Sequence, residues 1–361
     1  MVQSKAVIFK QVPTGLPVAG QDLTVEACEF DIEQAPPGGG VTTKNIYASF
    51  DPYQRGRMRE PTENSYSPPF DLGKPITNAI VAKVLKSNNE KFKAGDIVIG
   101  FLPIEEYSVV TKQAADALKN IGNPYNLDLM MFLGPLGMPG LTAYSSFYDI
   151  GQPKKGETIF ISAASGAVGQ LVGQLAKREG LKVVGSVGSD DKLEFILKEL
   201  DFDGGFNYKK EKPADALKRL APDGIDIYYE NVGGEQLEAA LDAMNNFGRI
   251  IACGMISEYS KADSERYGIR NLMSVVSKRI TMRGFIVGDE NMGPRYVKDC
   301  NEKVAKWLHD GSLKARISVT DGIDNAPRGF VDMLQGKNFG KAVLKIADVE
   351  VSAAPKFREK R

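Results

Sequence analysis

The stretch from residue 158 to 178 constrains the fold more than any other part of the sequence. A short apolar run, Thr158–Ile161, leads into small residues at 162–165, and Gly166 and Gly169 follow. Beyond the turn, apolar residues recur at the spacing of a helix that packs on one face: Val168, Leu171, Val172, Leu175 and Ala176. A strand, a turn poor in side chains and an amphipathic helix form the start of a parallel βαβ unit.

The composition of this turn also predicts what the unit binds. Where side chains are small, backbone N–H groups approach a pyrophosphate closely, and its charge lies at the helix N-terminus. Ala164, Gly166 and Gly169 form an AxGxxG pattern, with alanine where a dinucleotide-binding turn usually has its first glycine. Such a pattern is weak by itself, so a parallel strand followed by an ordinary packed helix stays open as the alternative.

The next β-run bears on which cofactor is bound. Residues 182–185 predict a second strand, and the residues after it are small, without the acidic side chain that grips the ribose hydroxyls in NAD enzymes. Small residues leave room for a 2′-phosphate and Lys192 supplies a cation, which favours NADPH. We interpret Asp190 and Asp191 as caps of a helix over 192–199. An ordinary solvated helix lysine is the alternative for Lys192.

The composition indicates a globular protein from a reducing compartment. The 361 residues are enough for two domains, and 46 basic residues balance 46 acidic ones. Neutrality predicts neither a nucleic-acid partner nor an anionic membrane partner, and no apolar run reaches the length of a membrane span. The N-terminus enters a β-run at once, so we expect no signal peptide, and the few scattered cysteines favour the cytosol.

The same counts argue against metal chemistry. Cys28, Cys253 and Cys300 lie far apart, and His309 is the single histidine, so no pair has metal-ligand spacing. We therefore expect no structural or catalytic zinc. His309 lies near a predicted helix end and is interpreted as a surface residue. Catalysis by a Ser-His-Asp or Cys-His set would have to use this one histidine, so we discount it.

Residues 1 to about 125 differ from the middle of the chain. Short β-runs broken by Gly and Pro predict a compact barrel or sandwich there; they cover 6–9, 41–48, 80–85, 97–100 and 107–110. Two stretches, 51–55 and 134–144, contain residues that a purely structural segment does not require. Two interpretations are open for Tyr53 and Met138 in these stretches: they line a pocket at a domain junction, or they belong to the core.

From residue 158 to about 287, strands and helices alternate as in a parallel sheet. The later strands are expected at 206–208, 225–229, 249–253 and 280–287, with helices at 214–220 and 236–244 between them. Residues 230–234 and 253–257 follow strand ends, where open α/β sheets bind ligands. Residues 258–270 read as a loop or lid. A helix over 295–309 precedes β-runs at 317–319 and near 341–346, and the last is expected to return to the first domain. The basic tail, 355–361, is interpreted as a solvated end.

Nine motifs in order carry a resemblance to a known family. ASGAVGQ, GSDDK, FNY, YENVGGE, CGMIS with Tyr259, GFIV and GKNFGKAV, together with DPY and GMPGLTAY, resemble the zinc-free medium-chain dehydrogenase/reductase superfamily. The likeness extends to about Ile346 and is greatest to the branch of leukotriene B4 dehydrogenase/prostaglandin reductase and alkenal double-bond reductases. The sequence departs from the family pattern at three places. Gln54 stands where relatives often carry Met, and the other two are Asp201-Phe202 and Glu258 to Ser260.

The resemblance implies an α/β fold of two domains. A Rossmann NADPH-binding domain would span 131–311, and both chain ends, 1–130 and 312–361, would form a GroES-like β-rich catalytic domain. The family also suggests a homodimer. The residues implied to contact the cofactor are Ala167, Val168, Gly169, Gln170, Lys192, Tyr208, Asn231, Cys253, Gly254, Ile256, Ser257, Tyr259, Phe285, Ile286, Val287 and Asn338. Tyr53, Met138 and Tyr259 would border the substrate.

The implied reaction is NADPH-dependent reduction of the C=C bond in α,β-unsaturated ketones and aldehydes. Hydride arriving at Cβ moves negative charge onto the carbonyl oxygen, so the enzyme must stabilise an enolate without metal. A tyrosine suits this task, and we hypothesise Tyr259 as the polarising or protonating group, with Tyr53 as the alternative. An exposed lid aromatic is the other reading of Tyr259. A quinone oxidoreductase and a non-catalytic NADPH-binding protein stay open as alternative functions.

Overall fold

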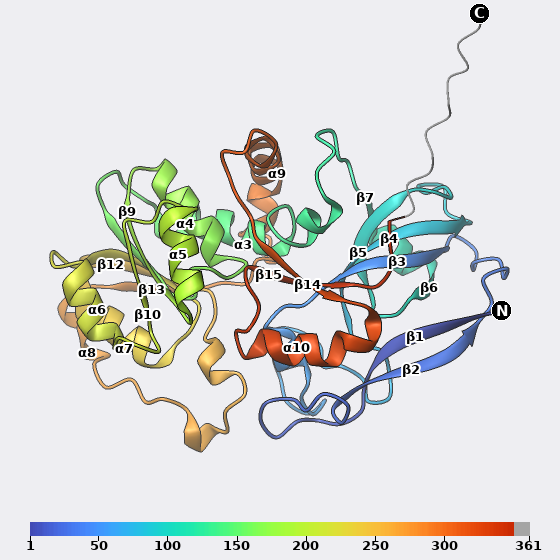
Figure 1. Cartoon of the computed structure of the whole chain (residues 1–361), viewed down its shortest axis with the longest axis horizontal. Helices are drawn as coiled ribbons and strands as arrows, with labels where there is room; N and C mark the ends of the chain where they lie inside the picture. Colours follow the sequence, from blue (N-terminus) through green and yellow to red (C-terminus); the bar gives the residue numbers. More distant parts are fainter. Residues whose placement is uncertain (350–361) are drawn as a thin grey trace, which may run out of the picture.

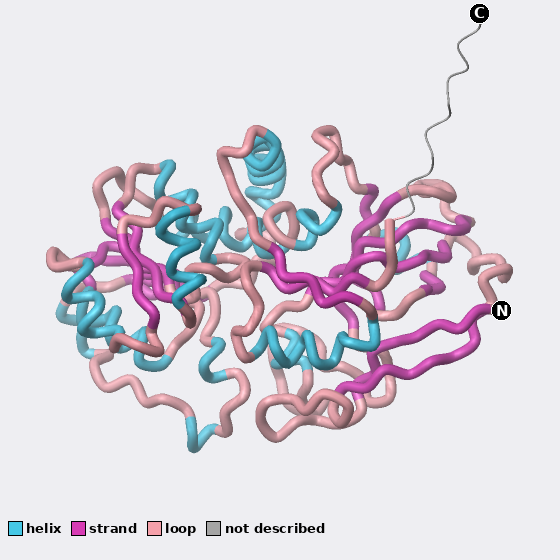
Figure 2. The backbone as a smooth tube through the Cα atoms, viewed as in Figure 1, coloured by secondary structure: helices cyan, strands magenta, loops and turns pink. Residues whose placement is uncertain are grey.

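A computed structural model of the chain describes residues 1–349. Figure 1 shows two groups of elements side by side: the middle of the chain forms one, and the two chain ends, in blue, cyan and red, form most of the other. Figure 2 shows that each group holds its own strands, with loops where the groups meet. Over these residues, no helix combines the length and the apolar composition that a membrane crossing requires. The tail at 355–361 lies outside the described residues.

The middle of the chain forms a parallel sheet with strand order β10-β9-β8-β11-β12-β13. Its strands are β8 (Thr158–Ile161), β9 (Lys182–Val187), β10 (Gly204–Asn207), β11 (Ile225–Glu230), β12 (Met244–Ala252) and β13 (Thr281–Gly284). The order reverses between β8 and β11, and a crevice opens beyond the strand ends at such a point. The expected doubly wound sheet is confirmed.

Helices cover both faces of this sheet. They are α3 (Met138–Ser146, continued by a π-helical turn, Phe147–Gly151), α4 (Gly169–Arg178), α5 (Asp190–Lys198), α6 (Pro213–Leu220), α7 (Gly234–Ala243), α8 (Met273–Ser277) and α9 (Gly293–His309). Side chains alternate between faces along a strand: Ile159 and Ile161 pack with α3, α4 and α9, whereas Phe160 packs with α6 and α7. Because helices cover both faces, side chains are buried on either side of a strand, which is why these strands are continuous apolar runs.

Both chain ends build the second sheet, ordered β14-β15-β3-β4-β5-β7 with β6 on β3. The β elements of this part are β1 (Val2–Phe9), β2 (Leu23–Phe30), β3 (Val41–Ser49), β4 (Thr77–Ser87), β5 (Ile97–Pro103), β6 (Tyr107–Val110), β7 (Lys119–Asn120), β14 (Ile317–Asp321) and β15 (Lys341–Lys345). Strand β15 pairs antiparallel with β3, where Leu344 lies opposite Ala48. The last β-run therefore returns to the first part of the chain, as expected.

The remaining elements are short. They are α1 (Gln54–Arg57), α2 (Lys112–Ala117), α10 (Ala326–Leu334) and the 3₁₀ turns Leu129–Leu133, Ile256–Glu258, Asp263–Glu265 and Ile323–Asn325. Strands β1 and β2 pair as a two-stranded ribbon, and β2 was not expected from the sequence. Its side chains are mostly exposed and do not alternate cleanly, so its sequence carries little strand signal.

Candidate active site

The glycine turn is built as the sequence predicted, with one difference in detail. The left-handed residue is Ala163, at φ +48°, and the N–H of Gly166 donates to its carbonyl oxygen at 2.9 Å. Helix α4 begins at Gly169, where a Cβ would lie 2.5 Å from the same oxygen. Only glycine allows the helix to start this close to the turn, which brings backbone N–H groups and the helix N-terminus to one place.

A cavity of about 630 Å³ lies beyond the ends of the parallel strands and reaches the second sheet. Nearly all of the residues expected at the site line it: Tyr53, Met138, Ala167, Val168, Gly169, Lys192, Tyr208, Asn231, Cys253, Gly254, Ile256, Ser257, Tyr259, Phe285, Ile286, Val287 and Asn338. Several do so because they follow a strand. Strand β13 ends at Gly284, shorter than expected, so the next three residues turn into the cavity.

Gln170 is not part of the cavity lining. Its side chain is buried, where Oε1 accepts the N–H of Arg316 at 2.8 Å and Nε2 donates to the carbonyl oxygen of Arg316 at 3.2 Å. Gln170 therefore joins α4 to the segment that precedes β14.

One end of the cavity carries Lys192 and Tyr208. Lys192 Nζ donates to the carbonyl oxygen of Gly336 at 2.7 Å, and burial lowers the pKa of Lys192. Tyr208 directly follows β10 and is 41% exposed. A Cβ on Gly188 would lie 2.8 Å from the Tyr208 hydroxyl, so a side chain at position 188 would close the space between them. An ammonium and a phenol beside side-chain-free backbone suit a phosphate group.

The expected caps of α5 are wrong in position. Ser189 is the N-cap residue, and Asp190 and Asp191 lie in the first turn. Asp190 instead accepts hydrogen bonds from Asn207, at 2.9 Å, and from Lys210. The carboxylates still complement the positive end of the helix, because they lie in its first turn.

The loop after β11 is held by a buried carboxylate. Oε1 of Glu230 accepts the N–H groups of Val232 at 2.6 Å and Gly233 at 2.8 Å, and burial raises the pKa of Glu230. The Asn231 side chain donates to the carbonyl oxygen of Ser162 at 2.8 Å. The loops after β8 and β11 are therefore joined at the cavity floor.

Tyr259 lies just after a 3₁₀ turn, Ile256–Glu258, in the segment expected to be a lid. Its hydroxyl oxygen accepts the N–H of Met255 at 3.2 Å, and burial raises the pKa of Tyr259 to about 12. A Cβ on Gly254 would lie 2.7 Å from that hydroxyl. The phenol is therefore neutral at physiological pH, and its oxygen is already engaged as an acceptor.

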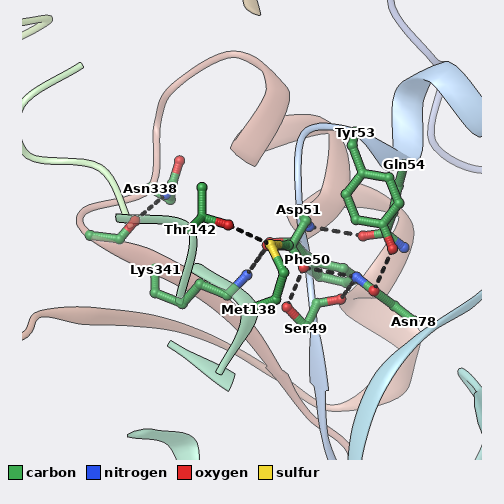
Figure 3. A network of polar contacts seen from close by, with 11 residues as sticks. Ser49, Phe50, Asp51, Tyr53, Gln54, Asn78, Met138, Thr142, Asn338 and Lys341 are labelled. Carbon is green, nitrogen blue, oxygen red and sulfur yellow. Dashed lines mark hydrogen bonds and ion pairs between the residues drawn. The ribbon is translucent and has the colours of Figure 1, made fainter. Parts of the chain in front are cut away.

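The other tyrosine, Tyr53, belongs to a polar network in the wall formed by the second sheet (Figure 3). Its hydroxyl donates to Oδ1 of Asn78 at 2.9 Å, and Nδ2 of Asn78 donates to Oδ2 of Asp51 at 2.9 Å. Lys341 Nζ donates to Oδ1 of Asp51 at 2.8 Å. Burial lowers the pKa of Lys341 and the Asp51 charge opposes that shift.

Sequence reasoning missed several lining residues. Asn78 and Lys341 belong to strands, and nothing in the local pattern marks them as cavity residues. The aromatic rings of Tyr66, Phe101 and Phe132 also line the cavity, and Tyr66 is 64% exposed although it is large and apolar. A usable signal existed only for Tyr66, since exposed aromatics on loops often form binding surfaces, whereas Phe101 lies in β5 and Phe132 in a 3₁₀ turn.

Among the described residues, no group of three His, Cys, Asp or Glu side chains is arranged to hold a metal ion.

Comparison with known proteins agrees with this geometry. Residues 5–118 match the family described as the N-terminal domain of oxidoreductase, and residues 167–304 match the family described as zinc-binding dehydrogenase. The NADP-dependent oxidoreductase RED1 of Cochliobolus heterostrophus is 58% identical over 97% of this chain and 99% of its own length. The NADP(+)-dependent 2-alkenal reductase of Nicotiana tabacum is 44% identical over 96% of this chain and 98% of its own.

A solved structure extends the comparison to the cofactor. CurA from Vibrio vulnificus in complex with NADPH is 32% identical to this chain and has a TM-score of 0.86. The match covers 96% of this chain and 100% of the CurA chain. A parallel sheet with a glycine turn, joined to a β-rich part made by both chain ends, defines an NADP-dependent oxidoreductase whose cofactor is NADPH. The chain belongs to the medium-chain dehydrogenase/reductase superfamily, in the zinc-free branch that includes the alkenal double-bond reductases.

Proposed function

We propose that the protein reduces the C=C bond of α,β-unsaturated ketones and aldehydes with NADPH. The observation that carries the proposal is the Tyr259 hydroxyl, a neutral donor in the cavity wall whose oxygen accepts the Met255 N–H and whose proton has no partner among the described residues. A neutral phenol matches the charge that develops on a carbonyl oxygen during this reaction. The identity to a 2-alkenal reductase supports the same substrate class.

The residues present fit NADPH. The turn at Gly166 and Gly169 offers backbone N–H groups to the pyrophosphate, and Lys192 with Tyr208 would hold the 2′-phosphate. Asn231, Phe285 and the other cofactor residues implied by the resemblance line the same cavity. The bound cofactor supplies the hydride.

The two tyrosines have different hydrogen-bonding roles. Tyr53 gives its proton to Asn78, so toward the cavity its oxygen can only accept. The Tyr259 oxygen accepts a hydrogen bond from the Met255 N–H, which leaves its own O–H to donate to a ligand. With hydride delivered to Cβ, the Tyr259 hydroxyl would donate a hydrogen bond to the carbonyl oxygen and stabilise the enolate. Cα would then take up a proton from solvent, which gives the saturated carbonyl compound. We therefore assign Tyr259 as the catalytic donor and Tyr53 to the substrate wall.

The test is NADPH oxidation by the full-length protein with an enone, an enal and a quinone, each repeated with NADH. We expect turnover of the enone and enal, identification of the saturated carbonyl as product, and a preference for NADPH. Turnover of the quinone alone would replace the proposal by a quinone oxidoreductase. Tight NADPH binding without oxidation by any acceptor would indicate a binding protein.

A homodimer in the cytosol is the expected setting for this enzyme. Strand β13 is an edge strand of the parallel sheet, and Leu272, Met273 and Val276, which shortly precede it in the chain, are 55%, 72% and 66% exposed. An unpaired edge beside apolar side chains supports pairing with a second copy. Met273→Glu with Val276→Glu should give monomers in light scattering, whereas Val319→Glu, on edge strand β14, should not.

A further inference from the structure

The cavity wall around Tyr53 is organised by a buried lysine, Lys341. Its Nζ donates to the carbonyl oxygen of Phe50 at 2.5 Å and to Oδ1 of Asp51 at 2.8 Å. The side chains of Lys341 and Asp51 are only 1% and 5% exposed, yet both residues line the cavity. Figure 3 shows the ammonium pointing at the segment that carries Asp51 and Tyr53.

Stability alone does not explain this ion pair. Taking both charges out of water costs about as much as their attraction returns, and apolar residues of similar volume often stabilise a protein equally well or better. A buried pair in the wall of a ligand cavity therefore points to a role in the site.

Two acceptors, the Asp51 carboxylate and the Ser49 carbonyl oxygen, set the direction of the hydrogen bonds that follow. A carboxylate only accepts, so Asn78 must turn its Nδ2 toward Asp51 and its Oδ1 toward Tyr53. Because Oδ1 also only accepts, Tyr53 must donate to it. Nδ2 of Asn78 donates to the Ser49 carbonyl oxygen as well, at 2.8 Å, which holds the amide in this orientation.

The backbone of Lys341 is held just as firmly. It is the first residue of β15, and its N–H donates to the carbonyl oxygen of Arg316 at 3.0 Å. Gly340 before it has φ +74° and forms a bridge with Gly166 of the glycine turn. A Cβ on Gly340 would lie 2.0 Å from the Arg316 oxygen, so this close approach needs glycine. Lys341 thus joins the cofactor turn to the tyrosine wall.

We propose that Lys341 is a positioning residue: through Asp51 and Asn78 it fixes the Tyr53 hydroxyl as a hydrogen-bond acceptor toward the ligand in the cavity. The inference rests on the proposed function for its substrate side. It predicts that the energetic effect of Tyr53 on substrate binding falls when the charged pair is removed, because the Ser49 carbonyl oxygen alone then orients Asn78.

A double-mutant cycle tests this role. Lys341→Met with Asp51→Asn removes both charges together, so no buried charge is left unpaired. We expect the melting temperature and the Kd for NADPH to stay near the wild-type values while the KM for an enone that carries a hydroxyl group rises about tenfold, the order of one lost hydrogen bond. The hydroxyl group is needed because a plain enone has no proton to donate to Tyr53. Tyr53→Phe should cost about the same in the wild type and change KM less than about twofold in the neutral-pair background.

Two results would overturn the inference: a wild-type KM in the neutral-pair variant, or an equal cost of Tyr53→Phe in both backgrounds. If that variant fails to fold, Asn78→Ala breaks the connection and leaves the ion pair intact, and the same rise in KM and the same loss of the Tyr53 effect are expected. A wild-type KM for Asn78→Ala would then contradict the role.

Lys345→Met is the matched control. Lys345 lies on the same strand, and its surface ion pairs reach Asp348 at 2.7 Å and Asp321 at 3.8 Å, so its KM should stay at the wild-type value. Enone turnover by the wild type tests the proposed function separately. If only a quinone is reduced, the proposed function fails, and the cycle repeated with a hydroxyl-bearing quinone still decides the role of Lys341.

Discussion

Lys192 and Gly336 are 144 residues apart in sequence, yet Lys192 Nζ donates to the Gly336 carbonyl oxygen at 2.7 Å. The bond joins helix α5, on the parallel sheet, to the segment after α10. It uses one of the three ammonium protons and leaves two for another acceptor. The lysine is therefore held in the cavity wall and is not a freely solvated helix residue.

Lys192→Ala should weaken NADPH binding selectively. Loss of a charge-assisted contact to a phosphate costs about 1.5–3 kcal/mol, which corresponds to about a tenfold to a hundredfold rise in the Kd for NADPH. NADH, which lacks the 2′-phosphate, should bind as before. Fluorescence titration with both cofactors measures this. Lys198→Ala on the same helix, whose partner is Glu194, is the control. An equal loss with both cofactors would refute the assignment.

Tyr259→Phe should lower kcat and leave NADPH binding intact. Removing one donor to a developing oxyanion typically costs about a hundredfold to a thousandfold in kcat. Steady-state kinetics with a saturating enone gives the value, and Tyr53→Phe, which we expect to act on KM, is the comparison. Full turnover by the Tyr259→Phe variant would remove this residue from the catalytic role.

Gly169→Ala should both destabilise the protein and weaken NADPH binding. The added Cβ would meet the Ala163 oxygen at 2.5 Å and the Ala164 Cα at 2.8 Å, and backbone atoms cannot move aside cheaply. We expect a loss of about 1–3 kcal/mol in the free energy of unfolding, measured by urea denaturation without cofactor. Gly38→Ala, where a Cβ meets nothing within 4 Å, should be neutral. Wild-type stability for Gly169→Ala would show that the turn adapts.

Stability should fall at alkaline pH because of buried tyrosines. Burial raises the pKa of Tyr259 to about 12 and that of Tyr228 and Tyr229 well above the ordinary value of about 10. Above pH ~10 these hydroxyls stay protonated in the folded protein and ionise in the unfolded chain. The unfolded state then binds fewer protons, so the free energy of unfolding declines by about 1.4 kcal/mol per pH unit for each hydroxyl.

Urea unfolding at a series of pH values measures this decline. Tyr229→Phe removes one of the three groups and also the contact with Ser146, at 2.8 Å. It should therefore reduce stability at neutral pH by about 1 kcal/mol and make the alkaline decline shallower. An unchanged slope would mean that Tyr229 does not contribute to it.

Local pattern was enough for most of the parallel sheet. Strand β8 and the starts of β9 and β11 lie where the apolar runs predicted them, because a buried strand needs a continuous run of such residues. Pattern failed where the side chains face solvent, as in β2, and at element ends, where the structure stops β13 at Gly284 and starts α5 at Asp190. Hydrogen bonding at such ends depends on neighbouring segments as well as on local sequence.

Most of the candidate site was also visible in the sequence, because residues that follow parallel strands meet at one edge of the sheet. Tyr208, Asn231 and Cys253 are of this kind, and all three line the cavity. Gln170 follows the same logic by position, but its side chain turns to Arg316. Phe101 and Tyr66 belong to the other part of the chain, and only the packing of the two parts brings them to the cavity.

The sequence by itself determined the alternation of strands and helices in the parallel sheet, the glycine turn and the class of cofactor, since each depends on residues that lie close together in the chain. Tertiary structure decided that Lys341 meets Asp51, 290 residues away, and that the Tyr53 hydroxyl donates to Asn78 whereas the Tyr259 hydroxyl accepts the Met255 N–H. The physical reason is that a lysine in a strand has no local property that marks it as buried. Its partner exists only because β15 pairs with β3 and carries the ammonium to the carboxylate.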